Sequence, residues 1–569
     1  MHGSGRRRPG WLALFPLLTL AVFLLPIGAG LLGTLLPAFG WLPALGGERF
    51  TLSPWRDLLA APGLETAVLL SLGSGLGATL LSLALTLGVC AAFQGRPLFR
   101  RLQRLVAPLL AMLHAAFAIG LAFLLAPSGF LARLVSPWLS GWERPPDLAT
   151  VQDPWGLAMT LALVAKETPF LLLMALSALN QVPAARLVTA GRTLGYGRAA
   201  AGRRFVLPAV YPQLRLPLFA VLAYSLSQVE VALILGPTTP PPLAPLVLEW
   251  FADPALSRRF QGAAGALLQL ALVAGCIALW LAAERIVAGT WRRRLESGRR
   301  GGSGRLLRSL AGGGFGLLLA MALATLLLLA LWSVARQWRF PGLLPGEWSL
   351  ETLQRALPAL GAPFGTTLAA GLVAALLAVG LVLGCLEHEA RRRVAMTRRA
   401  LALVYLPLLL PQVAFLFGVQ VLLLLGRLEG TWPALVAVPL LLVLPCAFRS
   451  LGDPRRALDP RLAITARTLG LPPWRVFLRI TLPVLLRPVL AALAVSFAVS
   501  VGLYLPTLFA GAGRLTTLTT EAVALASGGD RRLAAVYALL QAILPMAGFL
   551  LALWLPRLVW RRRRGMRVD

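Results

Sequence analysis

The residues with the most chemical potential lie inside stretches that are otherwise apolar. Lys166 and Glu167 stand together in "LVAKETPF", Glu230 stands in "SLSQVEVAL", and His114 stands in "MLHAAFAIG". An ionisable side chain costs at least ~2.5–3.5 kcal/mol at the centre of a bilayer, so such residues usually face a partner or a water-filled cavity. We interpret these four as candidate lining residues of a polar path through a membrane. The alternative is a structural lock, in which Lys166 pairs with Glu230 or another acid.

A fifth polar residue joins them when two apolar stretches are aligned. Placing Gly120 over Gly418 puts His114 opposite Gln412 of "LPQVAFLFG". Two polar residues at the same depth indicate that both line the path. A hydrogen bond from each side chain to a neighbouring helix is the alternative.

The sequence offers no residue set suited to catalysis. "GSGLGATL" at 73–80 is rich in glycine, but it lacks the lysine and the Ser/Thr with which a P-loop holds phosphates and Mg²⁺. The chain has 3 histidines, and its 4 cysteines lie in apolar stretches, where a free thiol behaves as a small hydrophobe. We therefore expect no catalytic residue, metal ion, disulfide or cofactor. An intramembrane enzyme has no Ser/His pair or metal cluster to support it.

The polar residues must be positioned by helices that cross a membrane. Hydrophobic residues make up 58% of the chain, and one span needs about 20 of them in sequence. The first apolar run follows three arginines, so a cleaved signal peptide is its alternative, although the run outlasts the usual signal core of about 7–15 residues. We predict an all-α, polytopic membrane protein with spans at 11–36, 65–93, 105–126, 155–179, 214–236, 262–283, 311–335, 364–386, 400–425, 432–448, 488–509 and 533–556.

The basic residues determine the predicted orientation, because lysine and arginine in short loops are retained on the cytoplasmic side. With the N-terminus inside, most of the 54 basic residues fall in cytoplasmic segments, and both termini face the cytoplasm. Topology and attraction to anionic lipid then explain the net charge of +32. The basic loops lack interleaved aromatic residues, so we expect no nucleic-acid partner. The cytoplasmic segments are 1–10, 94–104, 180–213, 284–310, 387–399, 449–487 and 557–569.

One of these cytoplasmic segments occurs twice. "RTLG" stands at 192–195 and again at 467–470, and a shift of 275 residues aligns identical residues around both copies. Both copies fall between the fourth and fifth spans of six. We therefore predict two homologous halves, 1–290 and 311–569, joined by a linker at 291–310. The identities are Arg186, Leu187, Arg192, Thr193, Leu194, Gly195, Arg204, Leu207 and Pro208 with Arg461, Leu462, Arg467, Thr468, Leu469, Gly470, Arg479, Leu482 and Pro483.

Each copy reads as two short helices around a turn. Gly470 is placed to end the first helix in the left-handed conformation, and Pro472 and Pro473 suit the first turn of the next. In the first copy Gly195 and Gly197 take the place of the breaker. We expect the Leu-Pro pairs at 207–208 and 482–483 to mark a turn back into the membrane. A helix lying across the cytoplasmic mouth is a lever that another protein can push.

These loops carry a family resemblance. "LDPRLAITARTLGLPPWRVFLRITLPVLLRP" resembles the E-A-A, three residues, G loop of binding-protein-dependent ABC importer permeases, and "ARLVTAGRTLGYGRAAAGRRFVLPAVYP" resembles it more loosely. In that family the loop is a coupling helix that docks on a cytoplasmic ATPase, which would be a separate chain and a homodimer. Two fused halves, and "ALILGPTTPPP" at 232–242, are similar to the ferric-iron and thiamine branch and its uncharacterised members. The resemblance implies a non-catalytic subunit in a bacterial inner membrane that imports a small molecule or ion.

The resemblance also implies which residues contact the ATPase. They are the identities in each loop apart from Leu187 and Leu462, together with Ala190 in the first loop, 182–212, and Ala466 and Phe477 in the second, 457–487. The family's acidic first letter falls on Thr189 and Ile464, so one docking contact is missing. We expect the second loop to dock more strongly because the first lacks the aromatic residue. The alternative for both loops is an amphipathic connector resting on lipid headgroups.

The outer loops complete the predicted organisation. The resemblance implies a periplasmic or lipid-anchored solute-binding protein that docks on them, and 37–64, 127–154, 237–261 and 336–363 are the candidates. Tryptophan near a helix end is more often an interfacial anchor than a docking contact. The main alternative class is an ion-coupled secondary carrier, which also commonly has twelve helices in two halves. The tryptophans concerned are Trp41, Trp55, Trp138, Trp142, Trp155 and Trp250.

Overall fold

The fold was described from a computed structural model, which covers residues 11–93, 99, 109–110, 112–296, 304–392 and 397–559. Within these ranges, 10 helices are long and apolar enough to cross a membrane, or up to 12 if each of two bent pairs is one span. The all-α, polytopic fold is therefore confirmed. The predicted terminal segments 1–10 and 560–569, and much of the loop 94–104 and of the linker, lie outside the described residues.

The first part of the chain is a series of long spans separated by short helices and one small hairpin. The strands β1 (Trp41–Leu42) and β2 (Gly47–Glu48) pair antiparallel on the loop after the first span. The helices are α1 (Leu14–Ala38), α2 (Ser53–Leu59), α3 (Leu64–Phe93), α5 (His114–Leu125), α6 (Phe130–Val135), α7 (Leu157–Gln181), α8 (Ala184–Thr193), α9 (Arg198–Ala201), the π-helical segment η3 (Gly202–Val206), α10 (Leu207–Leu226), α11 (Glu230–Leu235), α12 (Leu243–Ala252) and α13 (Arg258–Glu296).

The second part repeats this plan, again with one antiparallel hairpin, formed by β3 (Ala335–Gln337) and β4 (Glu347–Trp348). Its helices are α14 (Arg305–Val334), α15 (Glu351–Arg392), α16 (Arg398–Tyr405), α17 (Gln412–Leu425), α18 (Trp432–Arg456), α19 (Pro460–Thr468), α20 (Pro473–Val476), the π-helical segment η5 (Phe477–Thr481), α21 (Leu482–Val484), α22 (Leu486–Gly502), α23 (Leu505–Gly511), α24 (Leu518–Ser527) and α25 (Arg531–Val559).

The elements of the two parts correspond at a single spacing. Five of them, α7, α9, η3, α11 and α12, each begin 275 residues before α18, α20, η5, α23 and α24. The helices α5 and α17 begin at His114 and Gln412, the two residues that the glycine alignment places opposite one another. The shift found in the loops therefore extends, without insertion, from the fourth span to the short helix before the last.

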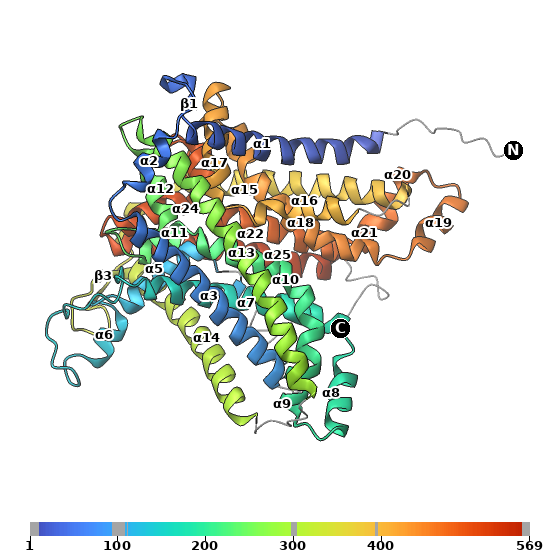
Figure 1. The fold of residues 1–569 in the computed structure, drawn as a ribbon, viewed down its shortest axis with the longest axis horizontal. Coiled ribbons are helices and arrows are strands. Elements are labelled where there is room, and N and C mark those ends of the chain that lie inside the picture. Colours follow the sequence, from blue (N-terminus) through green and yellow to red (C-terminus); the bar gives the residue numbers. More distant parts are fainter. Residues whose placement is uncertain are drawn as a thin grey trace.

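The first helix of each part packs against the other part. The helix α1 contacts α13, α15 and α17, and α14 contacts α25, α3 and α5. Figure 1 shows α14 beside α3, and α1 along the side where α15 and α17 lie. Glycine permits both crossings, because a Cβ on Gly418 would overlap the carbonyl of Gly30, and one on Gly120 would lie 2.7 Å from Cβ of Thr325. The two parts are thus interlocked.

Two short helices lie buried where the sequence predicts outer loops. The backbone N–H that starts α12, at Leu243, donates to Oγ of Ser71 at 2.9 Å, and the N–H that starts α24, at Leu518, donates to Oγ1 of Thr367 at 2.8 Å. A helix terminus at membrane depth needs such a partner because lipid offers none. The expectation that all of 237–261 is an outer docking loop is therefore wrong for α12, whose Trp250 is 5% exposed.

Proline residues change several predicted span boundaries. The ninth span consists of two helices bent by 94°, with Pro407 and Pro411 near the break, and the eleventh is bent by 76° at Leu485. Proline lacks the backbone N–H and therefore interrupts the ladder of helical hydrogen bonds. The fifth span runs through Arg198–Leu226 instead of 214–236, and Glu230 begins a separate helix after it.

Candidate functional sites: two paired loops and an intramembrane polar cluster

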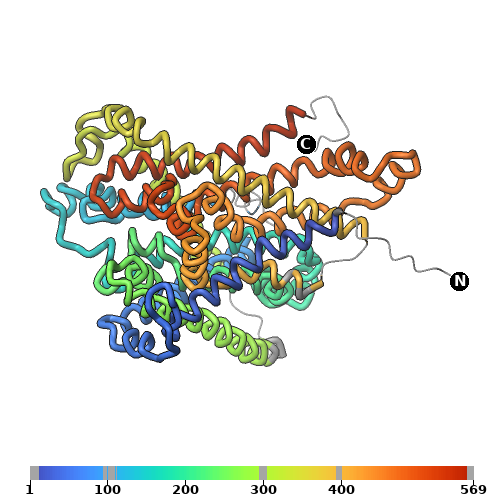
Figure 2. The backbone as a smooth tube through the Cα atoms, turned by 90° about the horizontal axis from the view of Figure 1, so that it is seen from above, coloured from blue at the N-terminus to red at the C-terminus, as the bar shows by residue number. Residues whose placement is uncertain are grey.

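The two repeated loops lie toward the same end of the molecule. The helices α8 and α9 of the first loop, and α19 and α20 of the second, are at the end away from β1, β3 and α6 (Figure 1). The view turned by 90° agrees, since the orange segment of the second loop and the teal segment of the first both lie toward the right (Figure 2). One rigid partner can therefore reach both loops from a single side.

Both loops turn through the same backbone geometry. Gly195 and Gly470 each have φ of +83°, which is the left-handed conformation that glycine tolerates. In the first loop the N–H of Tyr196 donates to the carbonyl of Gly191 at 3.1 Å, and in the second the N–H of Leu471 donates to that of Ala466 at 3.2 Å. These bonds form a Schellman motif at the end of each helix. The predicted role of the two glycines as left-handed breakers is confirmed.

The last residue of the E-A-A segment, Gly191 in the first loop and Ala466 in the second, packs inside the loop. A Cβ on Gly191 would lie 2.7 Å from Cβ of Ala201 and 2.9 Å from the ring of Phe205, and Ala466 in the second loop is 4% exposed. A larger side chain there would separate the two short helices. Ala190, one of the predicted ATPase-contact residues, is exposed. The sequence held the signal for Gly191, because the shift of 275 residues places it on Ala466.

Two expectations for the first loop are wrong. Gly197 has φ of −61° and ψ of 152°, so it precedes α9 in an extended conformation and is not a second left-handed breaker. The first Leu-Pro pair does not turn the chain, because Arg198–Leu226 is one span and the N–H of Leu207 donates to the carbonyl of Gly202. After the second pair the chain does turn, by 76° at Leu485, although the helix continues through Leu482. The following prolines offer no N–H, so the turn before each one is π-helical.

The loops present apolar side chains to solvent. Leu194 is 60% exposed and its counterpart Leu469 is 77% exposed. The second loop adds four more exposed large apolar side chains, which are Leu462, Ile464, Trp474 and Leu478. The charged side chains of Arg186, Arg192, Arg461 and Arg467 are also exposed. Large apolar side chains that are exposed among arginines are typical of a surface that contacts another protein.

The second loop is tied to two spanning helices. The guanidinium of Arg391 in α15 donates to the carbonyl of Pro473 at 3.0 Å, and it also donates to Oε1 of Glu387 at 2.7 Å. Arg455 in α18 donates to the other oxygen of Glu387 at 2.8 Å. The start of α20 therefore cannot move without disturbing the ends of α15 and α18.

The first loop has a different connection to its bundle. Arg204 lies over the ring of Tyr196, 4.9 Å from its centroid, and donates to its hydroxyl at 3.1 Å. Gly202 lies against the end of α3, where a Cβ would be 3.2 Å from the carbonyl oxygen of Ala91. This glycine stands where the second loop has Phe477, and a side chain there would press on the end of α3.

Four polar side chains from four helices meet inside the first part. His114 of α5 lies 3.2 Å from Oε1 of Glu167 in α7, and the hydroxyl of Tyr224 in α10 donates to Oε1 of Glu230 in α11 at 3.2 Å. The rings of His114 and Tyr224 are 4.9 Å apart between centroids. Three of the five predicted pathway residues are thus brought together. Tyr224 joins them, although the sequence did not mark it, because a neutral tyrosine carries no such cost in a bilayer as a charged side chain does.

The other two predicted residues lie outside this cluster. Lys166 donates to the carbonyls of Leu109 and Met112, the first at 3.0 Å, where the third span is interrupted before α5. Among the described residues it forms no ion pair with an acid, so the alternative of a lock between Lys166 and Glu230 or another acid is not formed there, and the ammonium binds backbone carbonyls instead. Gln412 is half-buried at the start of α17.

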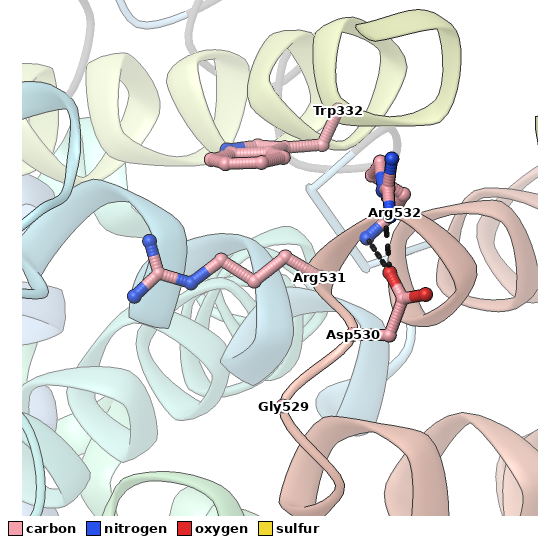
Figure 3. Close-up of a pocket in the computed structure, with 5 residues that line it drawn as sticks. All are labelled: Trp332, Gly529, Asp530, Arg531 and Arg532. Carbon is pink, nitrogen blue, oxygen red and sulfur yellow. Dashed lines mark hydrogen bonds and ion pairs between the residues drawn. The ribbon is translucent and has the colours of Figure 1, made fainter. Parts of the chain in front are cut away.

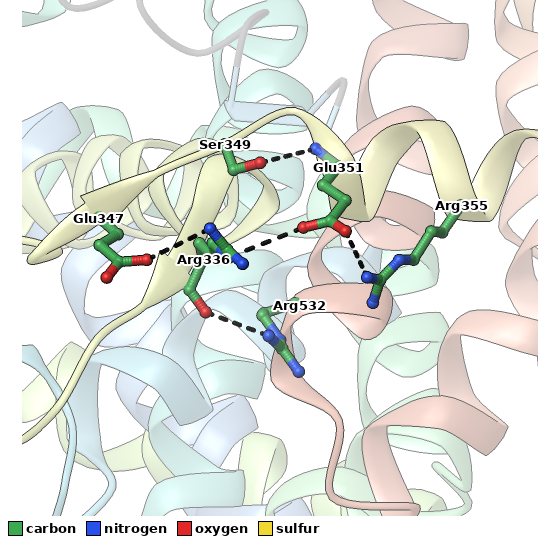
Figure 4. Close-up of polar contacts among 6 residues, drawn as sticks. All are labelled: Arg336, Glu347, Ser349, Glu351, Arg355 and Arg532. Carbon is green, nitrogen blue, oxygen red and sulfur yellow. Dashed lines mark hydrogen bonds and ion pairs between the residues drawn. The ribbon is translucent and has the colours of Figure 1, made fainter.

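The end of the molecule that carries the β3–β4 hairpin is held together by arginine side chains. Arg133 of α6 is 3% exposed and donates to the carbonyls of Trp338, Arg339 and Gly342 in the hairpin loop of the second part. In the same region Arg336 pairs with two glutamates, and Arg532 donates to the carbonyl of Arg336 at 3.1 Å (Figure 4). These contacts fasten α6, the β3–β4 hairpin and the start of α25 to one another.

A small hollow opens beside these contacts. It has a volume of about 400 Å³ and lies between Trp332 at the end of α14 and the turn before α25 (Figure 3). Arg532 pairs with Asp530 at 3.5 Å, and Arg531 lies over the Trp332 ring at 5.6 Å from its centroid. The hollow is thus lined by charges that are partly paired with each other.

A bundle of spanning helices that carries two matching loops defines a membrane permease subunit. Residues 352–565 match the family described as "Binding-protein-dependent transport system inner membrane component". The chain is also 33% identical over 519 residues to the inner membrane ABC transporter permease protein YnjC of Escherichia coli (strain K12), covering 91% of this chain and 93% of that protein. The chain therefore belongs to the family of ABC transporter permeases of the inner membrane. This membership separates it from ion-coupled secondary carriers, which were the main alternative.

Proposed function

We propose that the chain supplies both halves of the permease of an ATP-driven importer, 1–290 and 311–569, around a linker at 291–310. The halves form one solute path, and the loops 182–212 and 457–487 dock on two copies of a cytoplasmic ATPase. Both termini lie in the cytoplasm. A solute-binding protein delivers the solute to the opposite face, which carries the two hairpins and α6.

The repeated geometry of the loops supports docking. Two loops that share a left-handed glycine and the same terminal hydrogen bonds, and that lie toward one end of the molecule, suit a partner with twofold symmetry. Their exposed Leu194 and Leu469 occupy equivalent positions, as expected when one groove on each ATPase copy receives one loop.

A resting place on lipid headgroups fits the second loop less well. Leu462 and Ile464 are both exposed although they are two residues apart, which places them on different sides of α19. A helix that lies on a membrane gathers its apolar side chains on one face. A groove that surrounds α19 buries both residues.

The connections of the loops suggest how force enters the bundle. A displacement of α20 is passed to α15 and α18 through Arg391, Glu387 and Arg455. In the first half a displacement of η3 is passed to α3 through the contact of Gly202 with Ala91. Because α1 and α14 each pack on the other half, the two halves tilt against one another as interlocked bodies.

Site-directed cross-linking tests this proposal. Cysteine placed at Leu469 is exposed, whereas the four native cysteines are buried or half-buried. A thiol cross-linker applied to native membranes should join this cysteine to a protein that contains a P-loop, and ATP should change the yield. Leu428→Cys, on the outer loop between α17 and α18, is the matched control. The proposal is wrong if the cysteine at 469 captures only lipid or reacts like the one at 428.

A further inference from the structure

We infer that the transported solute is an organic cation, recognised at a site formed by Glu167, Glu230, Tyr224 and His114; this inference rests on the proposed import function. The two carboxylates lie on facing helices on either side of two aromatic rings. That arrangement of acid and aromatic groups is the one that binds substituted ammonium ions.

Each carboxylate at the site is incompletely satisfied. Glu167 and Glu230 are 5% and 7% exposed, and among the described residues each has one hydrogen-bond partner, on Oε1. Buried carboxylates ordinarily accept from several donors or face a cation. Gln228, two residues before Glu230, is 3% exposed, and its amide nitrogen has no partner. The site therefore retains both negative charge and hydrogen-bonding capacity for a guest.

The protein's own intramembrane cation does not neutralise the site. The ammonium of Lys166 is directed at the carbonyls of Leu109 and Met112, as described above. Among the described residues Lys166 forms no ion pair with Glu167 or Glu230, and His114, which is charged only when protonated, is already engaged with Glu167. An anionic solute would meet Glu167 and Glu230 without a free positive group beside them.

The fold itself does not require these carboxylates. The shift of 275 residues places Leu442 opposite Glu167 and Leu505 opposite Glu230, and both leucines are buried. The second half therefore builds the same helices with apolar side chains at these positions. Acids confined to one half indicate a role in recognition, because a structural role would apply to both copies.

The spacing of the donors favours an organic cation over a metal ion. Among the described residues, no three His, Cys, Asp or Glu side chains gather closely enough to hold a metal ion. The carboxylates contact two different rings, which are tilted against each other by 57°, instead of converging on one point. A charge spread over an alkylated ammonium group fits rings and carboxylates together.

The site also lies where the two halves meet. The helix α11, which carries Glu230, packs against α24 of the second half, and α5, which carries His114, packs against α24 and α25. A tilt between the halves would therefore open and close this site. Its position is the one expected for a solute site in a transporter with two repeats.

Protection from a hydrophobic carbodiimide tests the inference on the purified full-length permease. This reagent adds to membrane-buried carboxyl groups, and mass spectrometry reports labelling at each glutamate. Choline should protect Glu167 and Glu230 several-fold, whereas its neutral carbon isostere dimethylbutanol should not. Glu284, which is bound by Arg215 at 2.8 Å and by Tyr211 at 2.6 Å, is the internal reference.

Two variants make the result specific. Glu230→Gln and Tyr224→Leu should each abolish protection of Glu167 by choline, and the exposed outer variant Glu65→Gln should leave it intact. The inference is overturned if dimethylbutanol protects as well as choline, or if choline does not protect. If Glu230→Gln does not fold, the comparison of choline with dimethylbutanol on the wild-type permease decides alone. The protection assay needs no ATPase, so a lack of protection by choline would not contradict the proposal that the loops dock on an ATPase. In the same way, a failed cross-link to the ATPase would not contradict the inference about the solute.

Discussion

Gly418 of α17 and Gly30 of α1 touch backbone to backbone, so that a Cβ on Gly418 would overlap the carbonyl group of Gly30. Gly418→Ala should therefore destabilise the protein by ~1–3 kcal/mol through overpacking, although alanine by itself favours a helix by about 1 kcal/mol. Gly28→Ala in α1 meets open space and should be neutral or slightly stabilising. Thermal unfolding in detergent, followed by tryptophan fluorescence, should separate the two variants. Equal midpoints would show that the interlocked packing is not important for stability.

Gly470→Ala places a side chain in a left-handed backbone. The expected strain is ~1–2 kcal/mol, confined to the end of α19, so the yield of ATPase cross-linking should fall while the bundle remains folded. Gly197→Ala is the matched control, because Gly197 has φ of −61° and open space around it. The prediction is contradicted if both alanine variants cross-link like the parent protein.

Leu469→Asp should weaken ATPase binding without affecting folding. The side chain is 77% exposed, and exposed substitutions usually change stability by less than ~0.5 kcal/mol. Loss of a hot-spot contact costs ~2 kcal/mol or more in binding, and we expect Leu469 to be such a contact. Leu194→Asp should have a smaller effect, because fewer apolar side chains surround it. Binding of the purified ATPase to both variants measures the difference, and a larger loss for Leu194→Asp would refute the expected ranking of the loops.

Arg391→Gln should uncouple ATP hydrolysis from transport. It removes the charged bonds from α15 to the carbonyl of Pro473 and to Glu387, and each such bond contributes ~1.5–3 kcal/mol. The ATPase should still bind and hydrolyse ATP, but less solute should cross per ATP. Arg392→Gln changes the exposed neighbour and should behave as the parent. Normal transport by Arg391→Gln in reconstituted vesicles would exclude this linkage.

Lys166→Met should lower the stability of the folded protein as well as its transport activity. The carbonyls of Leu109 and Met112 lose their donor at membrane depth, which costs ~1–3 kcal/mol for each unsatisfied group. The thermal midpoint in detergent should fall accordingly. Glu167→Gln leaves the hydrogen bonds from Lys166 to these carbonyls in place, so it should lower the thermal midpoint less. If Lys166→Met has a normal midpoint and no transport, the lysine belongs to the path.

Local chemistry determined much of the protein. Apolar run length requires spanning helices because backbone groups in lipid must be paired within the segment, and the repeated "RTLG" predicts its turn because only glycine readily adopts φ of +83°. The same repeat also holds the information for Gly191, although we selected Ala190. These features depend on residues close in sequence, so pattern and spacing reveal them.

Tertiary structure decided which distant side chains meet. The sequence marks Lys166, Glu167 and Glu230 as costly in a bilayer but does not distinguish a carbonyl partner from an acid. That choice depends on the break before α5, which places Leu109 and Met112 beside Lys166. Likewise, Tyr224 joins His114 because α5 and α10 converge. Such contacts between residues far apart in the chain are selected by the packing of whole helices, which no short stretch of sequence encodes.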